Sequence, residues 1–360
     1  MLVTVLCLLY CLAVIAVNGG DPLALVTIGT QFSEGIPEEA GGTEGYDGQF
    51  VYYIARDPST AAPYIDVPAY RFQRILLPLA GGLLSFGQEA LLPWVLLAVN
   101  LAALAGGTAL LEHLLVQQGV SRWYALGYAL SLGVFGTVRL SLPEVLAYGL
   151  VLGGIVLARR EQWMWSALVF ALAALAKETT LLFVAGYGLY LLIQQRWRLA
   201  VLFGLVAGLP FVVWQFVLYV RLGAFGVGSG GAMATGFEII PLAGVLRILF
   251  EGGPVVFVIF LLLLGPFVLV PTYWALRESW LMLRAERLSA YVLLMAVNAA
   301  IMLFVPFSTY REPLGILRFI VGLQIAVILY AAEKPSRRAL LNSTIWAITI
   351  FFLIGSDFAG

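Results

Sequence analysis

Apolar segments recur along almost the whole chain, from Leu2 to Ile354, with only short polar stretches between them. A run of roughly 17 to 25 apolar residues is long enough to cross the hydrocarbon core of a membrane as a helix. Charged residues make up 11% of the chain and apolar residues 62%, whereas a soluble domain carries about 25% charged residues. The sequence therefore predicts an all-α, polytopic membrane protein and excludes a soluble one.

About eleven transmembrane helices (about 10 to 12) are expected, forming one integral-membrane domain over residues 1–360. Met1 to Val17 lacks the basic start and the clear cleavage site of a signal peptide, so this segment is expected to be the first span. The other spans are expected at 90–116, 123–138, 143–158, 163–176, 179–193, 199–220, 254–275, 288–307, 314–332 and 339–354.

Three further segments are not expected to span the membrane. Residues 18–74 contain eight acidic residues but only three arginines, and they are expected to form a long first extracytoplasmic loop with interfacial helices and the candidate catalytic residues. Residues 75–87 are apolar but too short for a span, which predicts an interfacial or re-entrant helix. Residues 221–253 are expected to form a second, Gly-rich extracytoplasmic loop.

The orientation follows from the distribution of Lys and Arg, which are enriched in short cytoplasmic loops. With a cytoplasmic N-terminus, 11 basic and 5 acidic residues lie inside, which is a balance of +6, and 9 basic and 15 acidic residues lie outside, which is −6. The net charge of zero therefore hides a polarised molecule. A multi-pass protein of a bacterial plasma membrane is expected, with no nucleic-acid partner.

Several chemistries are excluded by residue counts. His113 is the only histidine, and the two cysteines, Cys7 and Cys11, lie on one apolar segment. These counts exclude a disulfide framework, a zinc cluster and a His-based catalytic triad. No cofactor is expected, and no residue pattern requires a divalent metal, although none excludes one.

Ionisable residues gather at the expected outer ends of the spans. Charged groups at or below the membrane interface are costly and usually face a protein interior or a water-filled cavity. A shared outer cavity is therefore expected. Lys177 and Glu178 can alternatively form a local salt bridge that closes their short turn. The residues concerned are Arg139, Glu144, Lys177, Glu178 and Arg318, with Asp47, Arg71 and Arg74 from the first loop.

Asp47 lies between Tyr46 and Gly48 in the densest group of polar and aromatic residues. One interpretation is a turn that exposes its carboxylate. The other is a helix N-cap, in which the carboxylate accepts backbone N–H groups. The residues Phe50, Tyr53 and Ile54 that follow share one helical face, which is expected to rest on the bilayer surface.

Two arginines flank Gln73 just before the expected interfacial helix. The guanidiniums of Arg71 and Arg74, with the Gln73 amide, suit recognition of a phosphate at headgroup level. Interfacial anchoring by snorkelling arginines is the alternative.

The order of these motifs resembles the GT-C superfamily of polytopic glycosyltransferases, and most specifically enzymes similar to GPI mannosyltransferase II and their bacterial relatives. The family's aromatic-Asp-Gly motif and following "IA" step resemble Tyr46-Asp47-Gly48 and Ile54-Ala55. Its short outer "S-E" connection, later basic residue and late Arg-aromatic pair resemble Ser141 to Glu144, Lys177 and Arg318-Phe319. Tyr46 stands where Trp is usual and Lys177 where Arg is common.

The resemblance implies a GT-C-like fold and inverting transfer of a sugar, mannose or a similar hexose or pentose, on the extracytoplasmic face. The donor would be a polyprenyl-phosphate-linked sugar, and the acceptor a hydroxyl of a glycan, lipid or protein. Asp47 is the expected general base. Donor phosphate and substrate are expected to bind Arg71, Gln73, Arg74, Lys177 and Arg318. Supporting polar roles are expected for Tyr46, Gln49, Arg139, Glu144, Glu178 and Arg311.

Two other classes of function are compatible with this composition. A transporter or flippase of a lipid-linked sugar or small solute is the main alternative. Such proteins typically bind near the bilayer midplane between repeated halves, and neither repeats nor many midplane charges occur here. A non-catalytic membrane subunit that binds a glycan or a partner is the third.

Overall fold

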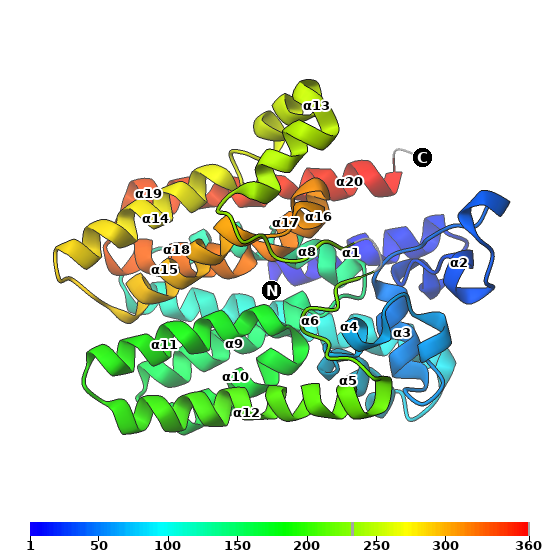
Figure 1. Ribbon diagram of the computed structural model, residues 1–360, viewed down its shortest axis with the longest axis horizontal. Helices are drawn as coiled ribbons and strands as arrows, with labels where there is room; N and C mark the ends of the chain where they lie inside the picture. Colours follow the sequence, from blue (N-terminus) through cyan, green and yellow to red (C-terminus); the bar gives the residue numbers. More distant parts are fainter. Residues whose placement is uncertain (232–233, 359–360) are drawn as a thin grey trace.

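The computed structural model describes residues 1–231 and 234–358, and the chain is helical throughout this part, without a β-strand (Figure 1). An isolated antiparallel bridge joins Ile28 to Gly45 within the expected first loop. The expected all-α fold is therefore confirmed.

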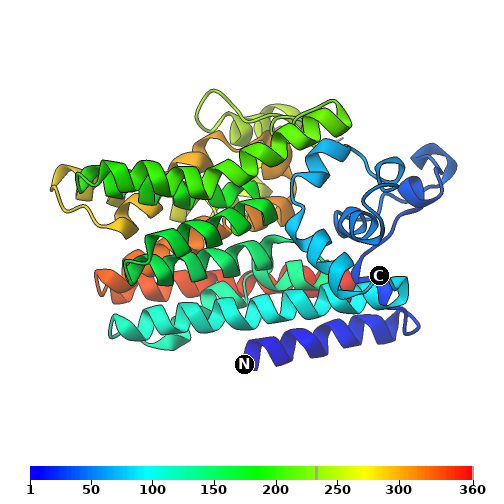
Figure 2. The same ribbon diagram turned by 90° about the horizontal axis from the view of Figure 1, so that it is seen from below.

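The longer helices except α13 (Ala243–Leu263) form a bundle that is elongated along the helix axes, α13 projects from it at an angle, and the short helices of residues 18–84 cover one end of it (Figures 1 and 2). The longer helices are α1 (Leu2–Val17), α6 (Leu92–Gln117), α9 (Glu144–Arg159), α10 (Trp163–Ala176), α11 (Leu181–Ile193), α12 (Trp197–Leu222), α13 (Ala243–Leu263), α14 (Leu269–Arg284), α15 (Ala290–Ile301) and α18 (Val321–Glu333). The shorter α-helices are α2 (Thr30–Ser33), α3 (Gly48–Arg56), α4 (Pro68–Phe72), α5 (Leu76–Leu84), α7 (Leu126–Ala129), α8 (Leu132–Arg139), α16 (Phe307–Arg311), α17 (Pro313–Phe319), α19 (Arg337–Ser343) and α20 (Ile350–Phe358). The 3₁₀ turns are η1 (Pro22–Leu25), η2 (Glu38–Ala40), η3 (Ala62–Tyr64), η4 (Glu89–Leu91), η5 (Arg122–Ala125), η6 (Glu178–Thr180), η7 (Met302–Phe304) and η8 (Thr344–Thr349).

The apolar helices are compatible with a membrane protein. Within the described residues, four helical segments are long and apolar enough to cross a membrane, namely 89–117, 197–222, 243–263 and 337–354, and the bent pair α17 and α18 makes a fifth if it is one span. Large apolar residues of α12 such as Leu205, Val213 and Phe216 are more than half exposed, as expected where lipid surrounds a helix. Four other apolar helical segments are 10–17 residues long. By length and composition, the helices therefore do not show the expected number of about eleven spans.

Several expected spans are interrupted in the structure. Gly265 and Pro266 end α13, so the expected span 254–275 is divided between α13 and α14. Pro254 lies inside α13 rather than at its start, because Gly253 adopts a φ of 81° that allows a kink. Residues 314–332 bend by 43° between α17 and α18.

The expected span 123–138 and the expected loop 221–253 also differ from the structure. The first is divided into η5, α7 and α8, and the N–H of Leu132 at the start of α8 donates to the Thr349 hydroxyl at 2.9 Å. The second is helical at both ends, because α12 continues to Leu222 and α13 begins at Ala243.

Helix α3 packs into the protein rather than onto a bilayer surface. Phe50, Tyr53 and Ile54 are 4%, 4% and 0% exposed and belong to an apolar cluster with Leu77 of α5 and Leu96 of α6. The expectation that these side chains rest on the bilayer is therefore wrong, because α5 covers them. Helix α5 has only nine residues and exposes Leu83 and Phe86, next to its end, which suits an interfacial helix.

Gly48 sets the close approach of α3 to the connection between α8 and α9. A Cβ atom on Gly48 would lie 2.2 Å from the carbonyl oxygen of Leu140 and 2.9 Å from that of Val26. Gly48→Ala is therefore expected to lower the free energy of unfolding by about 1–3 kcal/mol, as overpacking does elsewhere. Thermal unfolding in detergent measures the effect. Gly106→Ala, in α6, where a Cβ meets nothing within 4 Å, is the matched control. Equal stability of both variants would contradict this packing.

Candidate active site

The tight connection between α8 and α9 delivers Glu144 to the interior. Ser141 takes a left-handed φ of 54°, and the side-chain amide of Asn100 donates to the carbonyl of Leu142 at 3.1 Å. These contacts fix the turn, so that Glu144 begins α9 with its side chain only 1% exposed. A buried carboxylate is costly unless charged partners surround it.

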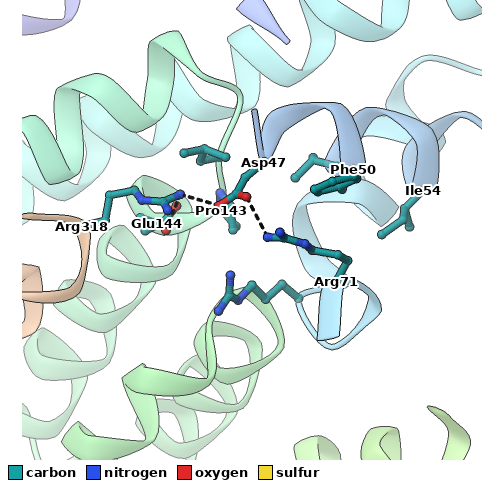
Figure 3. Close-up of a pocket in the computed structure, with 10 residues that line it drawn as sticks. Asp47, Phe50, Ile54, Arg71, Pro143, Glu144 and Arg318 are labelled. Atoms are coloured by element: carbon teal, nitrogen blue, oxygen red, sulfur yellow. Dashed lines mark hydrogen bonds and ion pairs between the residues drawn. The ribbon is translucent and has the colours of Figure 1, made fainter. Parts of the chain in front are cut away.

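Asp47 lies at the centre of a charged group at the end of the bundle (Figure 3). Arg71 Nη1 lies 2.9 Å from Asp47 Oδ1, and Arg318 Nη1 donates to Asp47 Oδ2 at 3.0 Å. Asp47 occupies the N-cap position of α3, but its side chain accepts no capping hydrogen bond. The interpretation as a capping carboxylate is therefore wrong, and that of a carboxylate presented to the site is favoured.

Burial by itself would raise the pKa of Asp47, but the guanidiniums of Arg71 and Arg318 outweigh burial and hold this pKa well below its usual range. The carboxyl is thus ionised at neutral pH. In the free protein, ion pairing with two cations also makes it a weak base.

The depressed pKa gives a pH-dependent contribution to stability. A carboxyl whose pKa is lowered by folding stabilises the protein fully above its unfolded pKa, about 3.9, and loses this contribution as the pH falls toward the lower folded value. The stability difference between wild type and Asp47→Asn is therefore expected to be constant from pH 7 to about 5 and to shrink below pH 4. Thermal unfolding at each pH measures it. A difference that grows on acidification would contradict the ion pairing.

Arg71 and Arg74 are both held inside the site by carboxylates. Arg71 donates from Nε and Nη2 to the two oxygens of Asp66, at 2.8 and 2.7 Å. Arg74 donates to Glu178 Oε2 and Oε1 at 2.9 and 2.7 Å. Each arginine side chain is only 13% exposed. Snorkelling toward solvent does not describe such paired, buried guanidiniums.

Lys177 pairs across helices rather than within its own turn. Its ammonium donates to Glu144 Oε1 at 2.6 Å, and the two side chains are 7% and 1% exposed. Arg318 Nη1 lies 3.7 Å from the same carboxylate oxygen. Since Glu178 pairs with Arg74, the alternative of a local Lys177–Glu178 bridge is wrong.

These groups line a pocket together with apolar side chains. Its cavity volume is about 20 Å³, which holds about one water molecule. Three guanidiniums and two carboxylates line it, together with the apolar residues Phe50, Val51, Ile54, Leu142 and Pro143. The charged residues are Asp47, Arg71, Arg74, Glu144 and Arg318 (Figure 3). The lining therefore carries a net charge of +1, from three positive and two negative groups.

Tyr46 and Gln73 lie beside this pocket without lining it. The Tyr46 hydroxyl donates to Glu312 at 2.6 Å, and its ring lies under the Arg318 guanidinium at 5.3 Å. Gln73 is 2% exposed, and its Oε1 accepts no hydrogen bond from the described residues. Tyr46 can thus orient Arg318, while Gln73 does not line the pocket.

Three other expected site residues have structural contacts instead. Gln49 accepts the N–H of Gly29 and donates to the carbonyl of Glu44, which holds the first loop together. Arg139 donates to the carbonyl of Ala24 and the hydroxyl of Thr27. Arg311 is exposed and stacks over Phe307 with its guanidinium 5.6 Å from the ring centre.

Asp66, Tyr70 and Glu312 contribute to the site but were not expected as site residues. Tyr70 accepts a hydrogen bond from Arg74 Nη2 at 2.9 Å. The signal for Asp66 is its place before Pro68, which begins the short helix that carries Arg71. Glu312 directly precedes Pro313 at the start of the helix that carries Arg318. Asp66 thus pairs with Arg71 directly, whereas Glu312 accepts a hydrogen bond from Tyr46, whose ring lies under Arg318.

No group of three or more His, Cys, Asp or Glu residues within the described ranges has an arrangement that could hold a metal ion. In the candidate site, Asp47 and Glu144 face guanidinium or ammonium groups. A comparison of the chain with known protein families, curated proteins and solved structures finds no match. The resemblance to the GT-C superfamily therefore stays a prediction.

Proposed function

We propose that this chain is an inverting membrane glycosyltransferase of the GT-C type, which moves a sugar from a polyprenyl-phosphate carrier to an acceptor hydroxyl. One observation carries the proposal: two carboxylates, three guanidiniums and five apolar side chains from distant parts of the sequence line one pocket. We further propose about eleven spans, a cytoplasmic N-terminus and an extracytoplasmic site in a bacterial plasma membrane.

The charged and the apolar lining residues suit the two parts of such a donor. A polyprenyl-phosphate sugar carries one negative charge at its phosphodiester, for which Arg71, Arg74 and Arg318 offer guanidinium donors. Its first isoprene units are apolar and suit the side chains of Phe50, Val51 and Ile54. The presence of guanidiniums and apolar side chains in one pocket fits a lipid-linked phosphate better than a soluble one.

The reaction assigns a role to each charged group. The acceptor hydroxyl gives its proton to Asp47 while its oxygen attacks the anomeric carbon. The bond from that carbon to the phosphate oxygen breaks, and its electron pair stays on the phosphate, which gains negative charge. Arg71, Arg74 and Arg318 stabilise this charge. Glu178 positions Arg74 directly. Lys177 holds Glu144, which lies beside Arg318.

Donor binding would also activate the base. Arg71 and Arg318 each contact Asp47 in the free protein. A donor phosphate competes with Asp47 for these guanidiniums, because one planar group has a limited number of donors. As phosphate takes over the contacts, the pKa of Asp47 rises toward its usual range, so the carboxylate becomes a better base once the donor is bound.

The test uses the full-length protein in proteoliposomes. Polyprenyl-phosphate mannose, glucose and arabinose, each labelled in the sugar, are offered with membrane extract as the source of acceptor. Release of polyprenyl phosphate together with transfer of label to an acceptor from one of these donors supports the proposal. Movement of intact donor between leaflets without release would instead establish the flippase and overturn the enzyme.

A further inference from the structure

A second pocket lies at the opposite end of the helices that carry the candidate active site. Its cavity volume is about 290 Å³. Glu144 begins α9 and Arg159 ends it, so the two pockets are separated by about 22 Å along this helix. The α11–α12 and α14–α15 connections lie at this end, away from α3 and α4 (Figure 1).

Two opposite charges face this second pocket without pairing. Arg159 and Glu333 both line it, and among the described residues neither takes part in an ion pair. Glu333 accepts one hydrogen bond, from Ser289 at 2.5 Å. The other charged lining residue, Glu161, is paired with Arg196 at 3.3 Å. The pocket therefore offers one cation and one anion to a ligand.

Further polar and aromatic groups complete the lining. Trp163 is 7% exposed, and its indole N–H has no acceptor in the described part of the chain. The amide nitrogen of Gln118 is also buried without a partner there. A buried donor without an acceptor is destabilising, so both groups favour a ligand with acceptor oxygens. Tyr187 and Tyr291 line the same pocket, and aromatic rings suit a neighbouring ammonium group.

We propose that this pocket binds the zwitterionic phosphoethanolamine headgroup of a membrane lipid. The phosphate oxygens would accept hydrogen bonds from Arg159 and the Trp163 indole. The ammonium group would donate to Glu333, beside the tyrosine rings. Trp and Tyr are common where a membrane protein meets the headgroup layer. Basic pockets between transmembrane helices on the cytoplasmic side bind lipid headgroups.

Native mass spectrometry of the full chain in detergent tests the proposal with three lipids of equal tails. Phosphatidylethanolamine is expected to be retained at least tenfold better than phosphatidylglycerol, which lacks the ammonium, and than phosphatidylcholine, whose ammonium cannot donate. Glycerophosphoethanolamine, which has no tails, is expected to displace it. Equal retention of the three lipids would overturn the proposal. Failure of the tail-free compound to displace the lipid would place recognition in the tails and overturn it too.

Matched variants on the same helices locate the site. Arg159→Gln and Trp163→Phe are expected to abolish the preference for phosphatidylethanolamine. Arg160→Gln and Trp165→Phe change the same residue types at exposed neighbours outside the pocket, and they are expected to keep it. Arg159 is exposed, so its replacement leaves the fold intact even if Trp163→Phe does not fold. Equal losses for Arg159→Gln and Arg160→Gln would overturn the assignment.

Discussion

Replacing Asp47 by asparagine is expected to lower sugar transfer by about 10²–10⁴-fold, the usual contribution of a general base. Asparagine keeps the size of the side chain but cannot take the acceptor's proton. The same change removes the negative charge that holds Arg71 and Arg318. Donor binding should therefore be retained or tighter, because the phosphate no longer competes with a carboxylate. The measurements are initial transfer rates and donor affinity in the same proteoliposomes.

Asp57→Asn is the control for this prediction. Asp57 follows the last residue of the helix that Asp47 precedes, and within the described part of the chain its carboxylate accepts hydrogen bonds from nearby Ser59 and Thr60. Its replacement should leave the transfer rate within about twofold, as for most surface changes. A structural role for Asp47 would instead lower donor binding and the transfer rate together. Unchanged transfer by Asp47→Asn would refute the base assignment.

The sequence was sufficient to place most of the charged residues at one site, with Arg139 as the exception, but not to pair them. Asp47, Glu144 and Arg318 were expected to share a cavity because ionisable groups near apolar helix ends need a common polar interior. Lys177 and its neighbour Glu178 nevertheless have different partners. Lys177 has an extended backbone, with φ of −156° and ψ of 123°, and successive side chains of an extended chain point in opposite directions. Proximity in sequence therefore favoured the wrong pair.

The limits of the helices were predictable where a residue breaks the backbone pattern and not elsewhere. Gly265 and Pro266 mark the end of α13, so the division of residues 254–275 has a sequence signal. The 43° bend between α17 and α18 occurs at Ile320, and the nearby Gly322 lies inside α18 without ending it, so the bend has no such signal. The role of Gln49 was hidden for a related reason, since its partners Gly29 and Glu44 are brought near only by the folded loop.

Replacing Lys177 by methionine is expected to cause the largest loss of stability, about 3 kcal/mol, at the lower end of the cost of breaking a buried ion pair. The change leaves Glu144 buried without its 2.6 Å partner. Arg318, at 3.7 Å, compensates part of the charge, which is why the lower end is expected. Lys334→Met, at the exposed end of α18, removes the only other lysine and should cost less than about 0.5 kcal/mol. Unfolding in mixed micelles measures both changes.

The double variant Lys177→Met, Glu144→Gln separates stability from function. Neutralising both members of the buried pair leaves neither Lys177 nor Glu144 as an uncompensated charge, so part of the loss should be recovered. Sugar transfer should not recover, because Glu144 lines the pocket and faces Arg318. Recovery of both stability and sugar transfer would mean that the ion pair of Lys177 and Glu144 has only a structural role. A single Lys177→Met variant as stable as Lys334→Met would contradict the pairing itself, since a solvated or distant Glu144 would lose nothing when Lys177 is removed.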